Sequence, residues 1–171
     1  VKTAADVPDD PASAVRIVLE RRLNALRAKA EDIVAEADFI YRRGQDLIGK
    51  SNIDCAAFED AYSDRTLGAY RRSVLVQKFF PLVGASDEEL ELGTANLLAY
   101  IDHAHGGVVP SLGHPSPVYR SFFNRQILRR GGLSTIAPML TPDDDAVGAV
   151  LTLYLIDSGA NVSVGRTLSR D

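Results

Sequence analysis

Acidic and histidine side chains at the end of an apolar segment are the most visible candidates for chemistry in this chain. The stretch LLAYIDHAHGG, at 97–107, contains Asp102, His103 and His105, and His114 follows in a loop. Histidine is the side chain best suited to metal binding and proton transfer near neutral pH. On a helix, however, His103 and His105 are separated by about 200°, so a regular turn cannot direct both toward one metal ion.

Helix capping is the interpretation that we favour for this stretch. Asp102 and His105 are three residues apart and therefore neighbours on a helix surface, and a histidine near a helix C-terminus is favoured by the macrodipole. The alternative is a histidine metalloenzyme using His103, His105 and His114, but no HExxH motif is present. GxGxxG, P-loop and GxSxG motifs are also missing. We expect no catalytic residue, no metal and no cofactor, and thus not an enzyme.

Arginine occurs in adjacent pairs, at 21–22, 42–43, 71–72 and 129–130. The planar guanidinium group suits carboxylate partners. We therefore predict that Arg42, Arg43, Arg71 and Arg72 bind acidic surfaces on another protein. The alternative is a solvated helix face with local salt bridges. A formal net charge of −4 argues against a dedicated nucleic-acid binder.

The composition is that of an ordinary globular protein. The chain has 171 residues, of which 46% are hydrophobic and 25% charged, enough for one self-supporting core. The longest apolar run, at 146–156, is much shorter than the roughly 20 residues that span a bilayer. Cys55 is the only cysteine, so no disulfide forms within the chain. We expect a protein that does not cross a membrane.

Apolar spacing and capping signals predict helices over 11–49, 54–80, 86–105, 116–130 and 141–156. Asp10 is the expected N-cap of the first helix, with Pro11 at its first position. A break is expected near Ser63 or Gly68, and Pro81 should end the second segment. Ser86 and Glu89 have the spacing of a capping box. The 141–156 segment also allows a strand, although we favour a helix.

The core candidates follow the apolar spacing of these segments. No heptad array is sustained long enough to predict a coiled coil. The candidates are Val15, Leu19, Leu23, Leu26, Ala30, Ile33, Ala37, Ile40, Leu47, Ile48, Ala57, Phe58, Tyr62, Leu67, Tyr70, Val74, Leu75, Phe79, Leu90, Leu97, Leu98, Ile101, Val118, Phe122, Phe123, Ile127 and Leu128.

The predicted fold is all-α: an up-down four-helix bundle with a C-terminal helical appendage and tail. The expected organisation is an N-terminal extension at 1–10, the four-helix bundle at 11–130, and the appendage and tail at 131–171.

Short motifs in the middle of the chain resemble those of the Q-type (PsbQ-like) extrinsic proteins of photosystem II. The second helical segment carries a Leu-Gly-x-x-Arg-Arg sequence at 67–72 and ends at Phe80 and Pro81. The third ends near Asp102 and Ala104, and the fourth opens around Tyr119. The glycine- and proline-rich stretch at 106–117 and everything after Gly131 depart from that pattern, which indicates a divergent algal relative.

This resemblance implies a non-catalytic extrinsic subunit of the chloroplast thylakoid lumen. Such a subunit would dock on the lumenal face of photosystem II, peripheral to the membrane, and stabilise the oxygen-evolving centre by retaining ions and shielding it. Two other classes stay open: a scaffold subunit of another organellar complex, and a helical ligand-sensing domain of a bacterial regulator.

Overall fold

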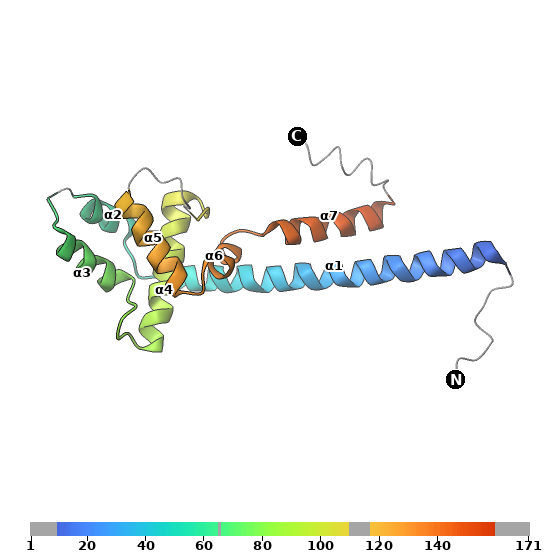
Figure 1. The fold of residues 1–171 in the computed structure, drawn as a ribbon, viewed down its shortest axis with the longest axis horizontal. Coiled ribbons are helices and arrows are strands. Elements are labelled where there is room, and N and C mark those ends of the chain that lie inside the picture. Colours follow the sequence, from blue (N-terminus) through green and yellow to red (C-terminus); the bar gives the residue numbers. More distant parts are fainter. Residues whose placement is uncertain (1–9, 65, 110–116, 160–171) are drawn as a thin grey trace. The chain divides into compact units, whose positions relative to one another are not determined.

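The computed structural model describes residues 10–64, 66–109 and 117–159, with backbone only at 117–121. Every regular element in these ranges is helical and none is a strand (Figure 1), so the all-α prediction is confirmed. The elements are α1 (Pro11–Gly49), α2 (Cys55–Ser63), α3 (Ala69–Phe79), α4 (Asp87–His105), α5 (Pro117–Arg129), α6 (Leu133–Ile136), the 3-10 turn η2 (Ala137–Met139) and α7 (Asp144–Ser158).

The expected helix positions agree with this order. The second predicted segment is divided into α2 and α3 at the expected break, and α7 confirms the helical interpretation of the last apolar run. His114 and Val118 were also named as candidates, but their side chains lie outside the described residues.

Two compact units make up the chain, and each is described by itself. One combines residues 1–36 with 144–171, and the other comprises residues 37–143. These units are defined by contacts within the chain, and the division into 1–10, 11–130 and 131–171 stays a prediction.

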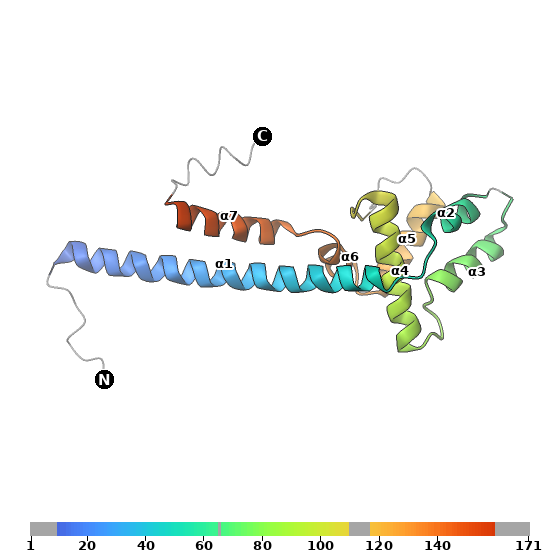
Figure 2. The ribbon, with the colours of Figure 1, turned by 180° about the vertical axis from the view of Figure 1, so that it is seen from behind.

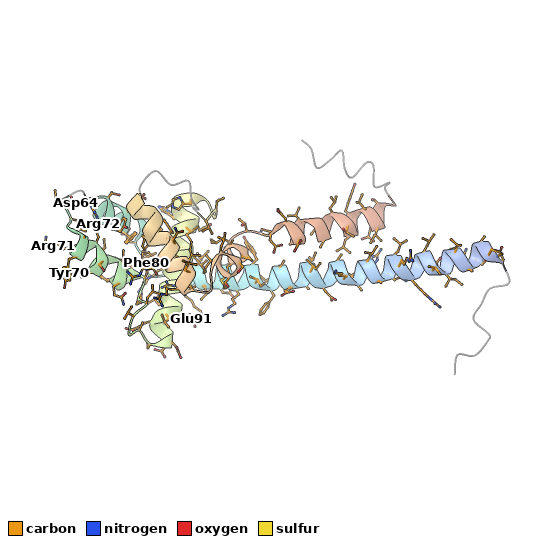
Figure 3. The ribbon with its side chains drawn as sticks, in the orientation of Figure 1. Asp64, Tyr70, Arg71, Arg72, Phe80 and Glu91 are labelled. Carbon is orange, nitrogen blue, oxygen red and sulfur yellow. The ribbon has the colours of Figure 1, made fainter. Side chains whose placement is uncertain are left out.

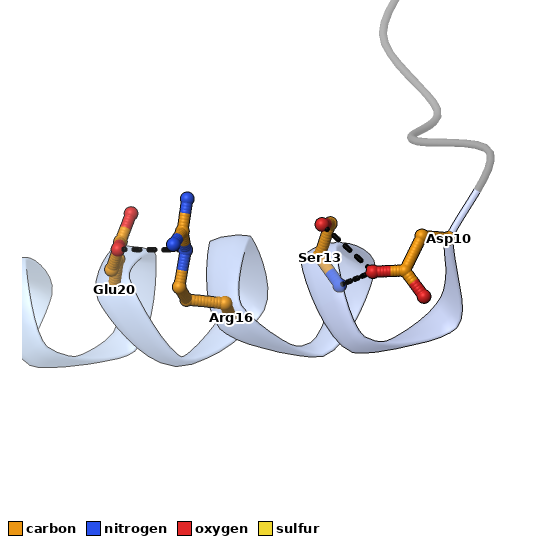
Figure 4. A network of polar contacts seen from close by, with 4 residues as sticks. All are labelled: Asp10, Ser13, Arg16 and Glu20. Carbon is orange, nitrogen blue, oxygen red and sulfur yellow. Dashed lines mark hydrogen bonds and ion pairs between the residues drawn. The ribbon is translucent and has the colours of Figure 1, made fainter.

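The helix ends form where the sequence places capping residues. Asp10 accepts hydrogen bonds from the backbone N–H of Ser13 at 3.0 Å and from its hydroxyl at 3.0 Å (Figure 4). These bonds lower the pKa of Asp10, and the bond from the Ser13 hydroxyl has the largest effect. Ser86 and Glu89 form the predicted reciprocal capping box, with bonds of 2.8 and 3.3 Å. Local hydrogen bonding therefore fixes where α1 and α4 begin.

The core of the 37–143 unit is built around aromatic rings. Phe58 of α2 meets Phe80 and Tyr100 edge to face, with ring centroids 5.1 and 5.2 Å apart. Phe123 of α5 stacks on Tyr100 at 5.9 Å. Such pairs add to apolar burial. Confirmed as buried in this unit are the candidates Leu47, Phe58, Tyr62, Leu97, Leu98, Ile101, Phe122, Phe123 and Ile127, and Ala30 is confirmed as buried in the other unit.

Several core candidates are instead exposed, namely Ala57, Tyr70, Val74 and Leu128. The α3 helix packs through its half-buried residues Leu75, Val76 and Phe79, and Tyr70 and Val74 lie on the opposite side of that helix. Leu128 follows the buried Ile127 and points about 100° away from it, toward solvent. The prediction that these four residues belong to the core is wrong.

Buried Asn96 and half-buried Arg130 hold the C-terminal end of α3. Asn96 of α4 donates to the Phe79 carbonyl at 2.9 Å and accepts bonds from the Ser51 hydroxyl and the Asn52 N–H. Arg130 donates to the Pro81 carbonyl at 3.1 Å. Because buried polar groups are costly when unpaired, these bonds fix the exit of α3 relative to α4 and α5.

The other unit contains the first part of α1 and α7, which lie side by side in both views (Figures 1 and 2). Arg27 and Asp157 form an ion pair between them. Small residues are buried, namely Ala30 on α1 and Ala146 and Ala149 on α7. The predicted core residues Val15, Leu19, Leu23 and Leu26 are about half exposed, because α7 ends at Ser158, next to the Asp157 that pairs with Arg27, and does not extend along the part of α1 before Arg27.

Candidate functional site

The outward side of α3 carries an exposed aromatic residue beside cationic residues. Tyr70, Arg71, Val74 and Lys78 lie within about 100° of one another on this helix, and we name this set the α3 face. Tyr70 is 81% exposed, and Val74 is exposed as well. Figure 3 shows Tyr70 and Arg71 on this helix.

Charge on α3 has a single sign. Its sequence, AYRRSVLVQKF, contains three cationic residues, Arg71, Arg72 and Lys78, and no acidic one. None of its side chains is fully buried. Tyrosine and arginine are the types most enriched where proteins bind tightly to one another. The α3 face can therefore form both apolar contacts and charge-assisted hydrogen bonds with a partner that carries carboxylates.

Arg72, the second arginine of the 71–72 pair, does not belong to the α3 face. It donates from Nη2 to the Asp64 carbonyl at 2.9 Å, and its buried Nε has no hydrogen-bond partner among the described residues. Hydrogen bonds from Thr66 are the main cause of a lowered pKa at Asp64. Arg72 therefore also closes the turn between α2 and α3, which the sequence does not indicate.

A groove of about 470 Å³ lies on the other side of Arg72. Arg72 and Arg125 contribute cationic groups, Tyr62, Val76, Leu82 and Phe122 contribute apolar surface, and no acidic residue is among its described lining residues. Arg125 was missed in the sequence, because no arginine neighbour marks it. Burial raises the pKa of Tyr62, so its hydroxyl stays neutral at physiological pH. The groove can hold an apolar group with a carboxylate end.

Arg42 and Arg43 lie on α1, in different surroundings from each other. Arg42 forms an exposed ion pair with Asp38, with Nε and Oδ2 2.9 Å apart. Arg43 lines a second cavity, of about 590 Å³, together with Arg129 and Arg130. Asp46 and the ion pair of Lys50 with Glu91 line the same cavity. Its mixed charge makes it a weaker anion site than the groove beside Arg72.

Arg130 is a half-buried cation whose described partners are all neutral. Its guanidinium donates to the Thr94 hydroxyl at 3.1 Å, to the Gln126 carbonyl at 3.3 Å and to the Gln126 side chain. Burial lowers the pKa of Arg130 to about 10, so it still carries its charge at neutral pH. These bonds give it a structural role between α4 and α5.

The histidine stretch lies at the end of α4. Gly106 adopts the left-handed conformation, with φ of 59°, and ends the helix after His105. His103 is exposed, whereas the His105 ring is half-buried and meets Tyr100 and Phe123 edge to face, at 6.1 and 5.5 Å. The structure thus directs the two histidines to different surroundings.

No group of three metal-binding side chains occurs within the described residues, which exclude His114. None of the described helices is both long and apolar enough to cross a membrane.

Comparison with models of known protein families gives no match, and comparisons with curated proteins and with solved structures give no significant match. The resemblance to the Q-type extrinsic proteins therefore rests on the short motifs at 67–81, 102–104 and 119 alone.

Proposed function

We propose that this chain is a non-catalytic docking subunit that binds an acidic surface of a larger protein complex through its α3 face. The observation that carries the proposal is the pairing of the exposed Tyr70 with Arg71 on a helix without acidic residues. An exposed tyrosine beside an arginine is a combination that is enriched at protein–protein interfaces. Carboxylates on that partner would bind Arg71 and Lys78, and its apolar atoms would cover Tyr70 and Val74.

The particular assembly that we propose is photosystem II, on the lumenal face of the thylakoid membrane. The motif resemblance is the support for this step, as it is for the role in ion retention and shielding of the oxygen-evolving centre. An up-down four-helix bundle over residues 11–130 belongs to the same proposal, and the all-helical character of the described residues supports it.

Rebinding to salt-washed thylakoid membranes tests the docking. The wild-type chain should sediment with washed membranes and be released by added salt, because exposed charges are screened. Arg71→Glu and Tyr70→Ala should each weaken sedimentation about tenfold or more. Arg42→Ala is the matched control, because it removes an arginine that is paired with Asp38, and it should bind as the wild type does.

Thermal unfolding of the same variants separates docking from folding. Both Tyr70 and Arg71 are exposed, so Tm should change little. Normal rebinding of Arg71→Glu and Tyr70→Ala would contradict the α3 face as docking surface. Rebinding to membranes that lack photosystem II would support docking and contradict the assigned complex.

The groove beside Arg72 supports a second candidate, a helical ligand-sensing domain. Its apolar walls with Arg72 and Arg125 at hand fit an aliphatic carboxylate. A saturable rise in Tm with octanoate, lost in Arg125→Ala, would favour this function. No change in Tm with octanoate would contradict it.

A further inference from the structure

The first part of α1 exposes a continuous apolar stripe. Val15, Leu19, Leu23 and Leu26 follow one another at spacings of four, four and three, and their exposed fractions lie between 47 and 59%. Single exposed leucines are ordinary on a protein surface, but an aligned series on one helix indicates a surface that binds something. From Leu19 onward the spacing of four and three is that of a heptad seam.

The α7 helix carries a second uncovered stripe. Ala146 and Ala149 are buried, whereas Val147, Val150 and Tyr154 are 55–59% exposed. Between its terminal acidic residues, α7 contains no charged side chain at all (AVGAVLTLYLI). A helix that is apolar on all sides belongs in the interior of a bundle. Within the described residues of this unit, α7 meets only one helix, α1, so this pair of helices leaves α7 incompletely packed.

The charge pattern along α1 indicates which partner covers these stripes. Residues 11–30 contain five cationic residues and one acidic residue, a net charge of +4, and residues 31–36 contain three acidic residues and no cation, a net charge of −3. An antiparallel copy of the same helix would bring each basic block toward the acidic block of the other copy. A parallel copy would place like charges together, which is unfavourable.

Other occupants fit this pattern less well. An anionic membrane surface or a uniformly acidic helix would be attracted by Arg22 and Lys29 but repelled by Glu31, Asp32 and Glu36 a turn or two further along. Only a partner whose charge changes sign along its length matches the whole segment, and a second copy of this chain has that property.

We propose that two copies of the chain associate through the helix pair formed by residues 11–36 and 144–158, with their α1 segments antiparallel. The two α1 segments and two α7 helices then form an intermolecular four-helix bundle, in which the stripes of α1 and α7 face the bundle interior. This surface shares no residue with the α3 face, so the inference stands independently of the docking function.

Sedimentation equilibrium of the full chain over a wide concentration range tests the association. The wild type should show twice the monomer mass of 18.5 kDa. The double variant Leu19→Glu/Leu23→Glu should dissociate to monomer, and its circular dichroism should keep the wild-type helix content, because both positions are exposed. Val83→Glu, at another exposed apolar position outside α1, is the matched control and should stay dimeric.

Charge reversal tests the orientation. Glu31→Lys/Glu36→Lys should raise the dimer dissociation constant about tenfold or more, as should Arg22→Glu/Lys29→Glu. An equimolar mixture of these two variants should regain part of the dimerisation, since the unchanged basic block of one variant meets the unchanged acidic block of the other.

A wild-type chain that stays monomeric at every concentration would overturn the proposal, even if another protein covers the stripes. A dimer that survives Leu19→Glu/Leu23→Glu would overturn the assigned surface. The antiparallel arrangement would be overturned if mixing the two charge-reversal variants did not strengthen their association and low salt did not strengthen the wild-type dimer. Arg71→Glu should leave the dimer intact, so failure of docking and failure of association are separate results.

Discussion

Gly93 of α4 lies against the guanidinium group of Arg130: a Cβ atom at position 93 would stand 2.7 Å from Arg130 Nη2 and 2.9 Å from Pro81 Cδ. Only glycine allows this approach, and through it Arg130 reaches Thr94, Gln126 and Pro81. The contact joins α4, the end of α5 and the turn after α3. It therefore supports the helix that presents the α3 face.

Gly93→Ala should destabilise the chain by about 1–3 kcal/mol, because the added methyl group overpacks this contact. Denaturant unfolding measures the change. Gly148→Ala is the matched control, since nothing lies within 4 Å of its Cβ position, and it should stabilise α7 by up to about 1 kcal/mol. Equal effects of the two substitutions would contradict the close packing at Gly93.

Arg130→Lys should cost about 1–3 kcal/mol, because a single ammonium group cannot reach the three partners that the guanidinium joins. In the Arg130→Ala background, Gly93→Ala should lower the stability less than in the wild type, because the Arg130 guanidinium no longer occupies the space beside position 93. Additive effects in this double-mutant cycle would show that the two residues do not interact.

Asn96→Ala should destabilise the chain by roughly 3 kcal/mol, because it leaves the Phe79 carbonyl and the Asn52 N–H without their partner in a buried region. Asn52→Ala removes one bond at an exposed side chain and should cost much less. Urea unfolding of both variants provides the comparison. A larger loss for Asn52→Ala would contradict Asn96 as the centre of this network.

Stability should decline at alkaline pH. Burial raises the pKa of the Cys55 thiol above 9.0 and that of the Tyr62 hydroxyl above 10.0. Because both folded-state pKa values exceed the unfolded ones, stability is complete below about pH 9 and falls as the pH rises above it, where the unfolded chain loses protons first. Urea midpoints measured from pH 7 to 11 provide the test.

Tyr62→Phe should flatten the part of this decline that lies above pH 10. A decline that is identical in wild type and Tyr62→Phe would assign the alkaline loss to other groups.

Helix ends are the part of this fold that could be predicted best from sequence. The Asp10 cap, the capping box of Ser86 with Glu89 and the stop at Pro81 depend on residues within four positions of one another. The break between α2 and α3 was also indicated by its local sequence. For the candidate site, the arginine pairs were recognised, but not that Arg71 faces outward while Arg72 bonds to the turn at Asp64.

Burial was predicted less well, because it depends on which elements meet. Tyr70 and Leu23 satisfy the apolar spacing of their helices as well as Phe58 does, yet only Phe58 is enclosed by other rings. Tyr70, expected in the core, belongs instead to the α3 face. Ala30 and Gly44 lie on the same side of α1 as Leu23 and are buried, Gly44 against Met139, so burial changes along one side of a single helix.

The sequence by itself determined the helical class, the helix limits and the caps, since the 3.6-residue period and capping bonds act over one or two turns. The tertiary structure alone decided which apolar stripes are covered, that Gly93 makes room for Arg130, and that Tyr70 stands exposed beside Arg71. Contacts of this kind join residues far apart in the chain, and the free energy of packing, rather than local propensity, selects them.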